Sequence, residues 1–174
     1  MNFQLQSSKW SPDVSRILAL GGDGARSELK KWKARTLFPL ARSPDGALAG
    51  IYSYFSCFDE AHAIAQDLHT KDGSYWHAIL HREEPDAGNA AYWFRQAGQH
   101  PVFPALHDAA AKLGYQLGYQ RGHETGARWD PFAFIDFCES ARLRPGSDEE
   151  ALAKQVQLVE WQLLFDYCSS QVTS

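Results

Sequence analysis

The chain has 174 residues, of which 44% are hydrophobic and 22% are charged, a composition that excludes a disordered chain. The net charge of −4 excludes a net basic field that could hold nucleic acid or an anionic membrane surface. Three widely separated cysteines without a CxxC pair predict reduced thiols, and no uncharged stretch is long enough to span a bilayer. We therefore expect a cytoplasmic protein with no nucleic-acid or membrane partner.

The N-terminal part of the sequence predicts a loosely held arm over residues 1–10, followed by two short helices. Ser11-Pro12 is typical of a helix start, with proline at the first helical position. The glycines of residues 21–24 predict the end of that first helix. Residues 27–34 favour a second, exposed helix, whose three lysines we interpret as a solvated face.

The middle of the chain predicts a succession of helices separated by proline and glycine. Ser43-Pro44 repeats the start signal before a helix over residues 47–55, for which a strand is the alternative because Ile51 to Phe55 is rich in β-formers. Asn89 is expected to cap one later helix. The further helices predicted in this region span residues 59–68, 74–84, 90–97 and 104–113.

The C-terminal part predicts a surface loop over residues 114–128 and two more helices. Asp130-Pro131 begins the first, and Ser147 with Glu150 forms a capping box for the second, which runs to about Cys168. The core side of this last helix is expected to hold Leu152, Val156, Val159, Leu163 and Tyr167, broadened by Trp161, Leu164 and Phe165. The sequence thus predicts a single all-α domain over residues 1–174, with about seven or eight helices and a long central C-terminal helix.

Two short motifs match known signatures only by coincidence. Residues 59–62 spell the DEAH box of a helicase family, but the chain has no GxxxxGK[ST] loop. The glycines of residues 21–24 lack the Lys-Ser/Thr of a phosphate-binding loop. The absence of GxSxG, HExxH and CxxC motifs argues against α/β-hydrolases, zincins and zinc fingers.

Histidines are the main functional signal, since six of the seven lie between residues 62 and 107. His77 and His81 are four residues apart, so a helix places both on one face, which Glu84 continues. Two imidazoles and a carboxylate can bind Zn²⁺ or another divalent metal. His62 is the better candidate for a further ligand, because His69 is expected at a frayed helix end. The alternatives are histidines that transfer protons near neutral pH, or histidines bonded to carboxylate or main-chain partners.

The residues around these histidines suggest a site for a small anionic ligand. Arg82 or Arg95 could clamp an anionic group, and Asp86 or Asn89 could orient the histidines. The side chains predicted to carry chemistry are His77, His81, Asp86 and Arg95, and those predicted to contact the ligand are Trp76, Arg82, Asn89, Tyr92 and Trp93. In the alternative interpretation the arginines pair with Asp86 or Glu84, and the tryptophans belong to the core.

Within residues 73–101, the runs GSYWHAILHREEPDAGN, YWFR and GQHP resemble a signature of an uncharacterised family of bacterial and fungal hypothetical proteins. The stretches DPF at 130–132 and EWQ at 160–162 extend the resemblance, which covers the chain from about Ala49 onward. The resemblance implies that residues 73–101 are the conserved segment of that family. It implies no activity and no catalytic residues.

Two functions from different classes fit these patterns. The first is a small-molecule-binding protein or enzyme with a histidine-centred pocket, using a divalent metal such as Zn²⁺ for hydrolytic or lyase-type chemistry on a small anionic metabolite. The second is a non-catalytic interaction or scaffold module, which could form a homo-oligomer. In the second, the histidine, arginine and aspartate cluster is a structural polar network and the loop over residues 114–128 carries the contact.

Overall fold

A computed structural model describes residues 12–20, 22–115 and 128–171 of the chain. The predicted arm over residues 1–10 and nearly all of the predicted loop over residues 114–128 lie outside these ranges. The helices are α1 (Pro12–Leu18), α2 (Gly22–Leu29), α3 (Ala34–Leu37), α4 (Pro44–Tyr54), α5 (Phe58–Asp67), α6 (Lys71–Glu83), α7 (Ala87–Ala97), α8 (Phe103–Lys112), α9 (Pro131–Arg142) and α10 (Asp148–Ser169).

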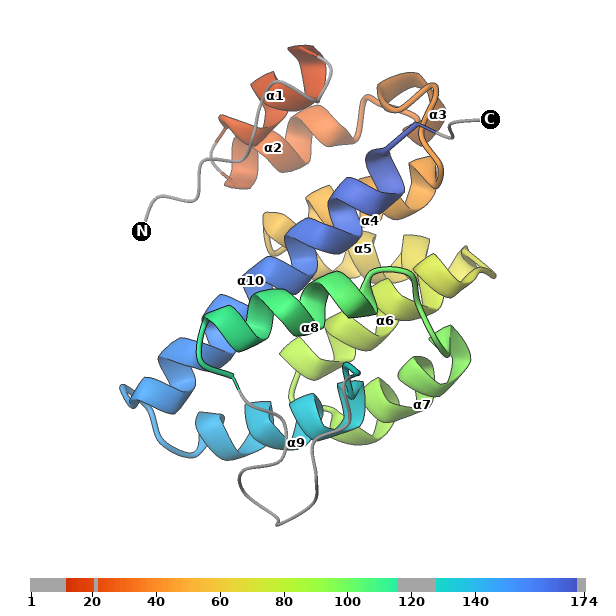
Figure 1. Cartoon of the computed structure of the whole chain (residues 1–174). Helices are drawn as coiled ribbons and strands as arrows, with labels where there is room; N and C mark the ends of the chain where they lie inside the picture. The colour runs from red at the N-terminus through yellow and green to blue at the C-terminus, as the bar shows by residue number, and fades with distance from the viewer. Residues whose placement is uncertain (1–11, 21, 116–127, 172–174) are drawn as a thin grey trace.

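The described residues confirm the all-α class, with ten helices rather than the expected seven or eight. Their one β feature is an isolated antiparallel bridge between Ala41 and Gln171. Figure 1 places α1 and α2 at one end of the molecule and α9 at the other, with the long α10 running between these ends. None of the helices in the described ranges is both long and apolar enough to cross a membrane.

The starts of α9 and α10 follow the predicted capping chemistry. The Asp130 carboxylate accepts hydrogen bonds from the N–H groups of Phe132 and Ala133. The Ser147 hydroxyl accepts from Glu150 N–H at 3.1 Å, as expected for a capping box. The Glu150 carboxylate, however, accepts at 2.7 Å from the N–H of residue 146, one residue before the N-cap, rather than from Ser147 N–H. The bonds to Asp130 and Ser147 satisfy backbone donors that a helix leaves unpaired at its first turn, so local sequence is enough to set both starts.

The N-terminal helices differ from the prediction. Residues 22–29 form α2, although their glycines were expected to end a helix and the second helix was expected over residues 27–34. Each glycine costs a helix about 1 kcal/mol relative to alanine. Burial of Ala25 and Leu29 offsets this cost, because both side chains are fully enclosed. The short helix α3 was not expected at all.

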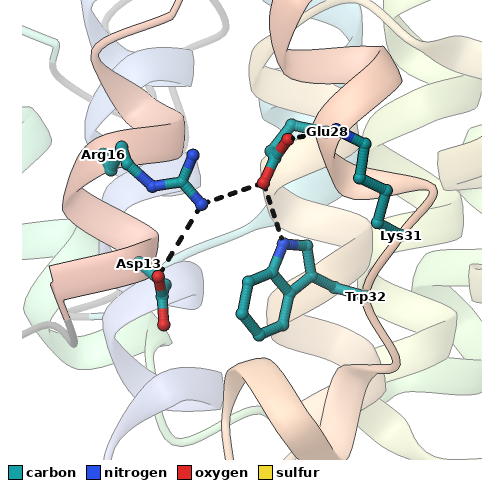
Figure 2. Close-up of polar contacts among 5 residues, drawn as sticks. All are labelled: Asp13, Arg16, Glu28, Lys31 and Trp32. Carbon is teal, nitrogen blue, oxygen red and sulfur yellow. Dashed lines mark hydrogen bonds and ion pairs between the residues drawn. The ribbon is translucent and has the colours of Figure 1, made fainter.

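Ion pairs join α2 to its neighbours. Figure 2 shows Arg16 of α1 reaching the Glu28 carboxylate at 2.9 Å, while Lys31 and the Trp32 indole donate to the same carboxylate. On the other side of α2, Arg26 holds the Glu60 carboxylate of α5 through two hydrogen bonds of 2.7 and 2.9 Å. The α1–α2 pair is therefore connected to α5, the helix that supplies one side chain of the site described below.

The longest helix, α10, has 22 residues and packs against α4, α8 and α9. Its buried residues are Ala153, Val156, Glu160, Trp161, Leu164, Phe165 and Cys168. The predicted core side is confirmed at Val156, Trp161, Leu164 and Phe165, which are buried. Its centre is shifted, however, because Leu163 and Tyr167 are only half-buried against the core. The large Trp161 and Phe165 rings, stacked with centroids 5.1 Å apart, turn their side of the helix into the core.

Candidate metal centre

Helix α6 places two histidines on one face. Its N-cap is Thr70, whose hydroxyl accepts a hydrogen bond from Gly73 N–H at 3.2 Å. The helix then runs through Glu83, so His77 and His81 lie one turn apart, as predicted. Helix α6 packs against both α5 and α7, and this places side chains from those two helices beside the histidines.

A third histidine comes from α5 and completes a cluster. The Nε2 atoms of His62 and His77 are 2.8 Å apart and share a hydrogen bond. The ring centroid of His81 lies 4.8 Å from that of His77 and 5.3 Å from that of His62. One ligating atom from each of the three residues lies within 4.8 Å of the other two. The structure therefore brings together three of the four predicted metal ligands, His62, His77 and His81.

Aromatic rings enclose the cluster on two sides. The indole of Trp93 on α7 stacks on the His77 ring with centroids 4.0 Å apart, and Phe58 on α5 stacks on the His62 ring at 5.5 Å. The His77 residue is only 2% exposed, whereas His62 and His81 are half-buried. Trp93 thus lies against the cluster, and its predicted contact with a ligand stays a prediction. Phe58 was missed, because its position one turn before His62 becomes informative only once His62 is known to be a site residue.

The environment keeps His77 neutral at pH 7. Burial, together with the neighbouring His62 and His81, lowers the pKa of His77 to about 4. Burial and His62 also lower the pKa of His81, although the nearby carboxylates of Asp86 and Glu84 act in the opposite direction. Metal binding needs a deprotonated imidazole nitrogen. At neutral pH, His77 therefore has a lone pair available for a metal ion, and no free energy is spent on removing a proton from it.

The structure does not bring Glu84 into the group of metal-ligating atoms. Helix α6 ends at Glu83, so Glu84 is the C-cap and does not continue the helical face as expected. Its carboxylate Oε2 lies 3.7 Å from His81 Nδ1, and 47% of its side chain is exposed. Glu84 is therefore a neighbour of one ligand rather than a fourth member of the cluster.

The acidic turn between α6 and α7 has a capping role. The Asp86 carboxylate accepts hydrogen bonds from Asn89 N–H at 3.0 Å and from Asn89 Nδ2 at 2.7 Å. Helix α7 consequently begins at Ala87, and Asp86 rather than Asn89 is its N-cap. The Asp86 N–H donates to the main-chain carbonyl of His81 at 2.9 Å. Within the described residues no hydrogen bond joins the Asp86 or Asn89 side chain to a histidine ring, so their predicted role in orienting the imidazoles stays a prediction.

Arg82 belongs to the core and not to a ligand clamp. It is fully buried and forms an ion pair with Glu160 of α10, which is also fully buried. The Tyr75 hydroxyl donates to the same carboxylate at 2.9 Å. This corrects both predictions for Arg82, since it neither faces a ligand nor pairs with Asp86 or Glu84. Glu160 lies 78 residues further along the chain, and nothing in the local sequence pointed to it.

Trp76 also belongs to the core, as the structural alternative predicted. A Cβ atom added to Gly50 would lie 2.7 Å from Trp76 Cζ2, so the indole packs directly against the backbone of α4. Tyr92 lies outside the core with 47% exposure and its ring edge against Trp93. Arg95 is exposed and makes no hydrogen bond or ion pair within the described residues.

The remaining described histidines lie outside the cluster. His69 is exposed beyond the end of α5, as expected, and His107 is half-buried on α8. His100 is buried: its Nδ1 accepts from Val102 N–H, so its Nε2 carries the proton and donates to Asp72 at 3.0 Å. The His100 ring is structural, because both of its nitrogens are already occupied. His123 lies outside the described residues.

The chain matches no protein-family model, no curated protein and no solved structure. The resemblance of residues 73–101 to a bacterial and fungal family therefore stays a prediction.

Proposed function

We propose that this protein binds a divalent metal ion of the zinc type through His62, His77 and His81. The observation that carries the proposal is the convergence of three imidazoles from two helices, with their ligating atoms within 4.8 Å of one another. Imidazole nitrogen suits zinc, copper and nickel, whereas magnesium and calcium prefer oxygen ligands. The group contains no thiolate and no carboxylate, which supports the same choice of metal.

The spacing of the imidazoles fits a tetrahedral ion. Zinc–nitrogen bonds of about 2.0–2.1 Å at tetrahedral angles place two ligating nitrogens roughly 3.3 Å apart. The two closest nitrogens, on His62 and His77, are 2.8 Å apart, and the upper limit within the cluster is 4.8 Å. The nitrogen–nitrogen separation that a tetrahedral zinc ion requires therefore lies between these two observed values. Small side-chain rotations suffice to accommodate an ion.

Three protein ligands leave a fourth position for water or substrate, which is the pattern of catalytic rather than structural zinc sites. A zinc ion in such a site supplies an activated water with a pKa near neutrality. Three neutral imidazoles do not compensate the charge of the ion, so an anionic ligand is favoured there. We infer hydrolytic or lyase-type chemistry on a small anionic metabolite. His77 and His81 then act as metal ligands rather than as acid–base groups.

The neighbouring α7 supplies the remaining proposed contacts. Trp93 and Tyr92 form an apolar side to the site. Arg95 is exposed two residues from Trp93, on a different face of α7, so it is not proposed as the cation that meets an anionic group. Arg82 has no such role, because Glu160 already neutralises it. That pair supports a structural role for part of the segment, but none of the three histidines takes part in it.

Elemental analysis and zinc titration of the purified protein test the metal site. We expect one equivalent of zinc per chain. His77→Ala should abolish this binding while the helical circular dichroism is retained. The matched control is His69→Ala, which removes an exposed histidine outside the cluster and should leave one equivalent bound. Wild-type protein that binds no zinc, or a His77→Ala variant that binds it as tightly as wild type, would overturn the proposal.

Activity is tested separately on the zinc-loaded protein. Hydrolysis of 4-nitrophenyl acetate and 4-nitrophenyl phosphate, and hydration of carbon dioxide, report on water activated at a three-histidine site. We expect at least one of these rates to depend on zinc and to be lost in His77→Ala. Equal rates with and without zinc in all three assays would contradict the catalytic part of the proposal and leave the metal site itself unaffected.

A further inference from the structure

We propose that Glu84 is a positioning residue for the metal site: it accepts a hydrogen bond from His81 Nδ1 and so directs Nε2 of that ring to the metal. This inference rests on the proposed function. It deepens that function by naming a residue that acts through a ligand without touching the ion. The sequence pattern predicts Glu84 as a metal ligand, whereas in the structure its carboxylate lies beside His81 and outside the group of ligating atoms.

The geometry around His81 supports this role. The Nδ1 atom of His81 is buried and has no hydrogen-bond partner among the described residues. The Glu84 Oε2 atom lies 3.7 Å away, which is too long for a hydrogen bond by about half an ångström. Glu84 is the C-cap of α6, and its side chain is nearly half exposed. A rotation of this half-exposed side chain can close the gap without moving the helix.

Metal binding creates the need for an acceptor at this atom. A neutral imidazole carries one proton, so a ring that ligates through Nε2 must carry that proton on Nδ1. Because Nδ1 of His81 is shielded from solvent, the N–H group requires an acceptor within the protein. A carboxylate in this position fixes the tautomer and the orientation of the ring and increases the basicity of the ligating nitrogen.

The other carboxylate near His81 is less suited to the role. Asp86 is electrostatically coupled to His81, but each of its oxygens already accepts a hydrogen bond from Asn89. Breaking these bonds would uncap α7. The carboxylate of Glu84 has no hydrogen-bond donor among the described residues, so it can turn toward His81 without any such loss.

Zinc affinity in competition with a chelator of known affinity tests the role of Glu84. We expect Glu84→Ala to weaken zinc binding about 10–100-fold while one equivalent still binds, the loss typical of an outer-shell partner of a metal-ligating histidine. Glu84→Gln keeps an acceptor but removes its charge, so it should fall between wild type and Glu84→Ala. The matched control is Glu83→Ala, which removes an exposed carboxylate one residue earlier and should leave the affinity unchanged.

Nitrogen-15 NMR of the zinc-loaded protein gives a readout that a merely structural role would not change. We expect the His81 proton on Nδ1 and zinc on Nε2. The opposite tautomer, or equal affinities for Glu84→Ala and Glu83→Ala, would overturn this inference while leaving the proposed function intact. Zinc binding that survives His77→Ala would instead overturn the proposed function, and this inference with it. Loss of affinity in Asp86→Asn but not in Glu84→Ala would transfer the role to Asp86 and refute the assignment.

Discussion

Replacing Glu160 with glutamine should strongly destabilise the protein, because the Glu160 carboxylate neutralises the buried Arg82 guanidinium. Among the described residues, no other carboxylate forms a hydrogen bond or ion pair with Arg82. Both side chains are 0% exposed, so water cannot solvate the remaining cation. Removing one partner of such a pair costs about 3–5 kcal/mol, a large share of the roughly 5–15 kcal/mol that holds a domain folded. For a chain of this length, the melting temperature should fall by about 6–20 °C. Glutamine preserves shape and still offers an acceptor to Tyr75.

Urea unfolding, followed by circular dichroism and tryptophan fluorescence, measures this loss. Glu139→Gln is the control, since it weakens an exposed ion pair with Arg142 and should change the free energy of unfolding little. Adding Arg82→Met to Glu160→Gln removes the stranded charge and should recover part of the lost stability. A loss below about 1 kcal/mol for Glu160→Gln would show that the Arg82 cation does not depend on Glu160, and so would a double variant less stable than the single one.

Three further outcomes follow from the core and from the buried histidine. Leu164→Ala should cost about 2–5 kcal/mol in urea unfolding, and Leu163→Ala clearly less; equal losses would contradict the observed orientation of α10. Gly50→Ala should lower the free energy of unfolding by about 1–3 kcal/mol, since its new methyl group would lie 2.7 Å from Trp76. An unchanged urea midpoint would show that α4 and α6 move apart to accommodate the methyl group without loss of stability. The pKa of His77 is about 4 when folded, against 6.5 for an ordinary histidine, so the unfolded chain binds more protons between these values. Stability present above pH 6.5 should therefore be lost as the pH falls toward 4, and His77→Gln should flatten this dependence.

Capping residues made the helix starts at the C-terminal end predictable. Asp130 and Ser147 bond to N–H groups two or three residues away, so the information lies within one turn of the helix. The same local logic located α4 at Pro44. Ser43, however, does not cap that helix with its side chain, and its N–H instead bonds to the carbonyl of Cys168 on α10.

Features that depend on distant contacts could not be predicted. The glycines of α2 indicate a break by local propensity, and burial of Ala25 and Leu29 against other elements overrides that tendency. The partner of Arg82 is 78 residues away, whereas sequence reasoning favoured carboxylates close to it. Arrangements of this kind are decided by how whole helices pack, and a single sequence carries no direct record of that packing.

The site shows the same division between local and distant information. The spacing of His77 and His81 was sufficient to place them together, because both lie on one helix. His62 could be proposed only as a candidate, since its approach depends on how α5 packs against α6. The prediction that Glu84 is a metal ligand was wrong because α6 ends one residue before it. Helix ends are the least certain feature of a sequence-based prediction.

Anomalous diffraction at the zinc absorption edge, from crystals grown with one equivalent of zinc, tests the three-histidine site most directly. We expect one strong peak, about 2.0–2.1 Å from a ring nitrogen of each of His62, His77 and His81. The three cysteines of the chain, Cys57, Cys138 and Cys168, are buried and should carry no metal. A peak at a cysteine or at surface carboxylates, with none among the three imidazoles, would contradict the account.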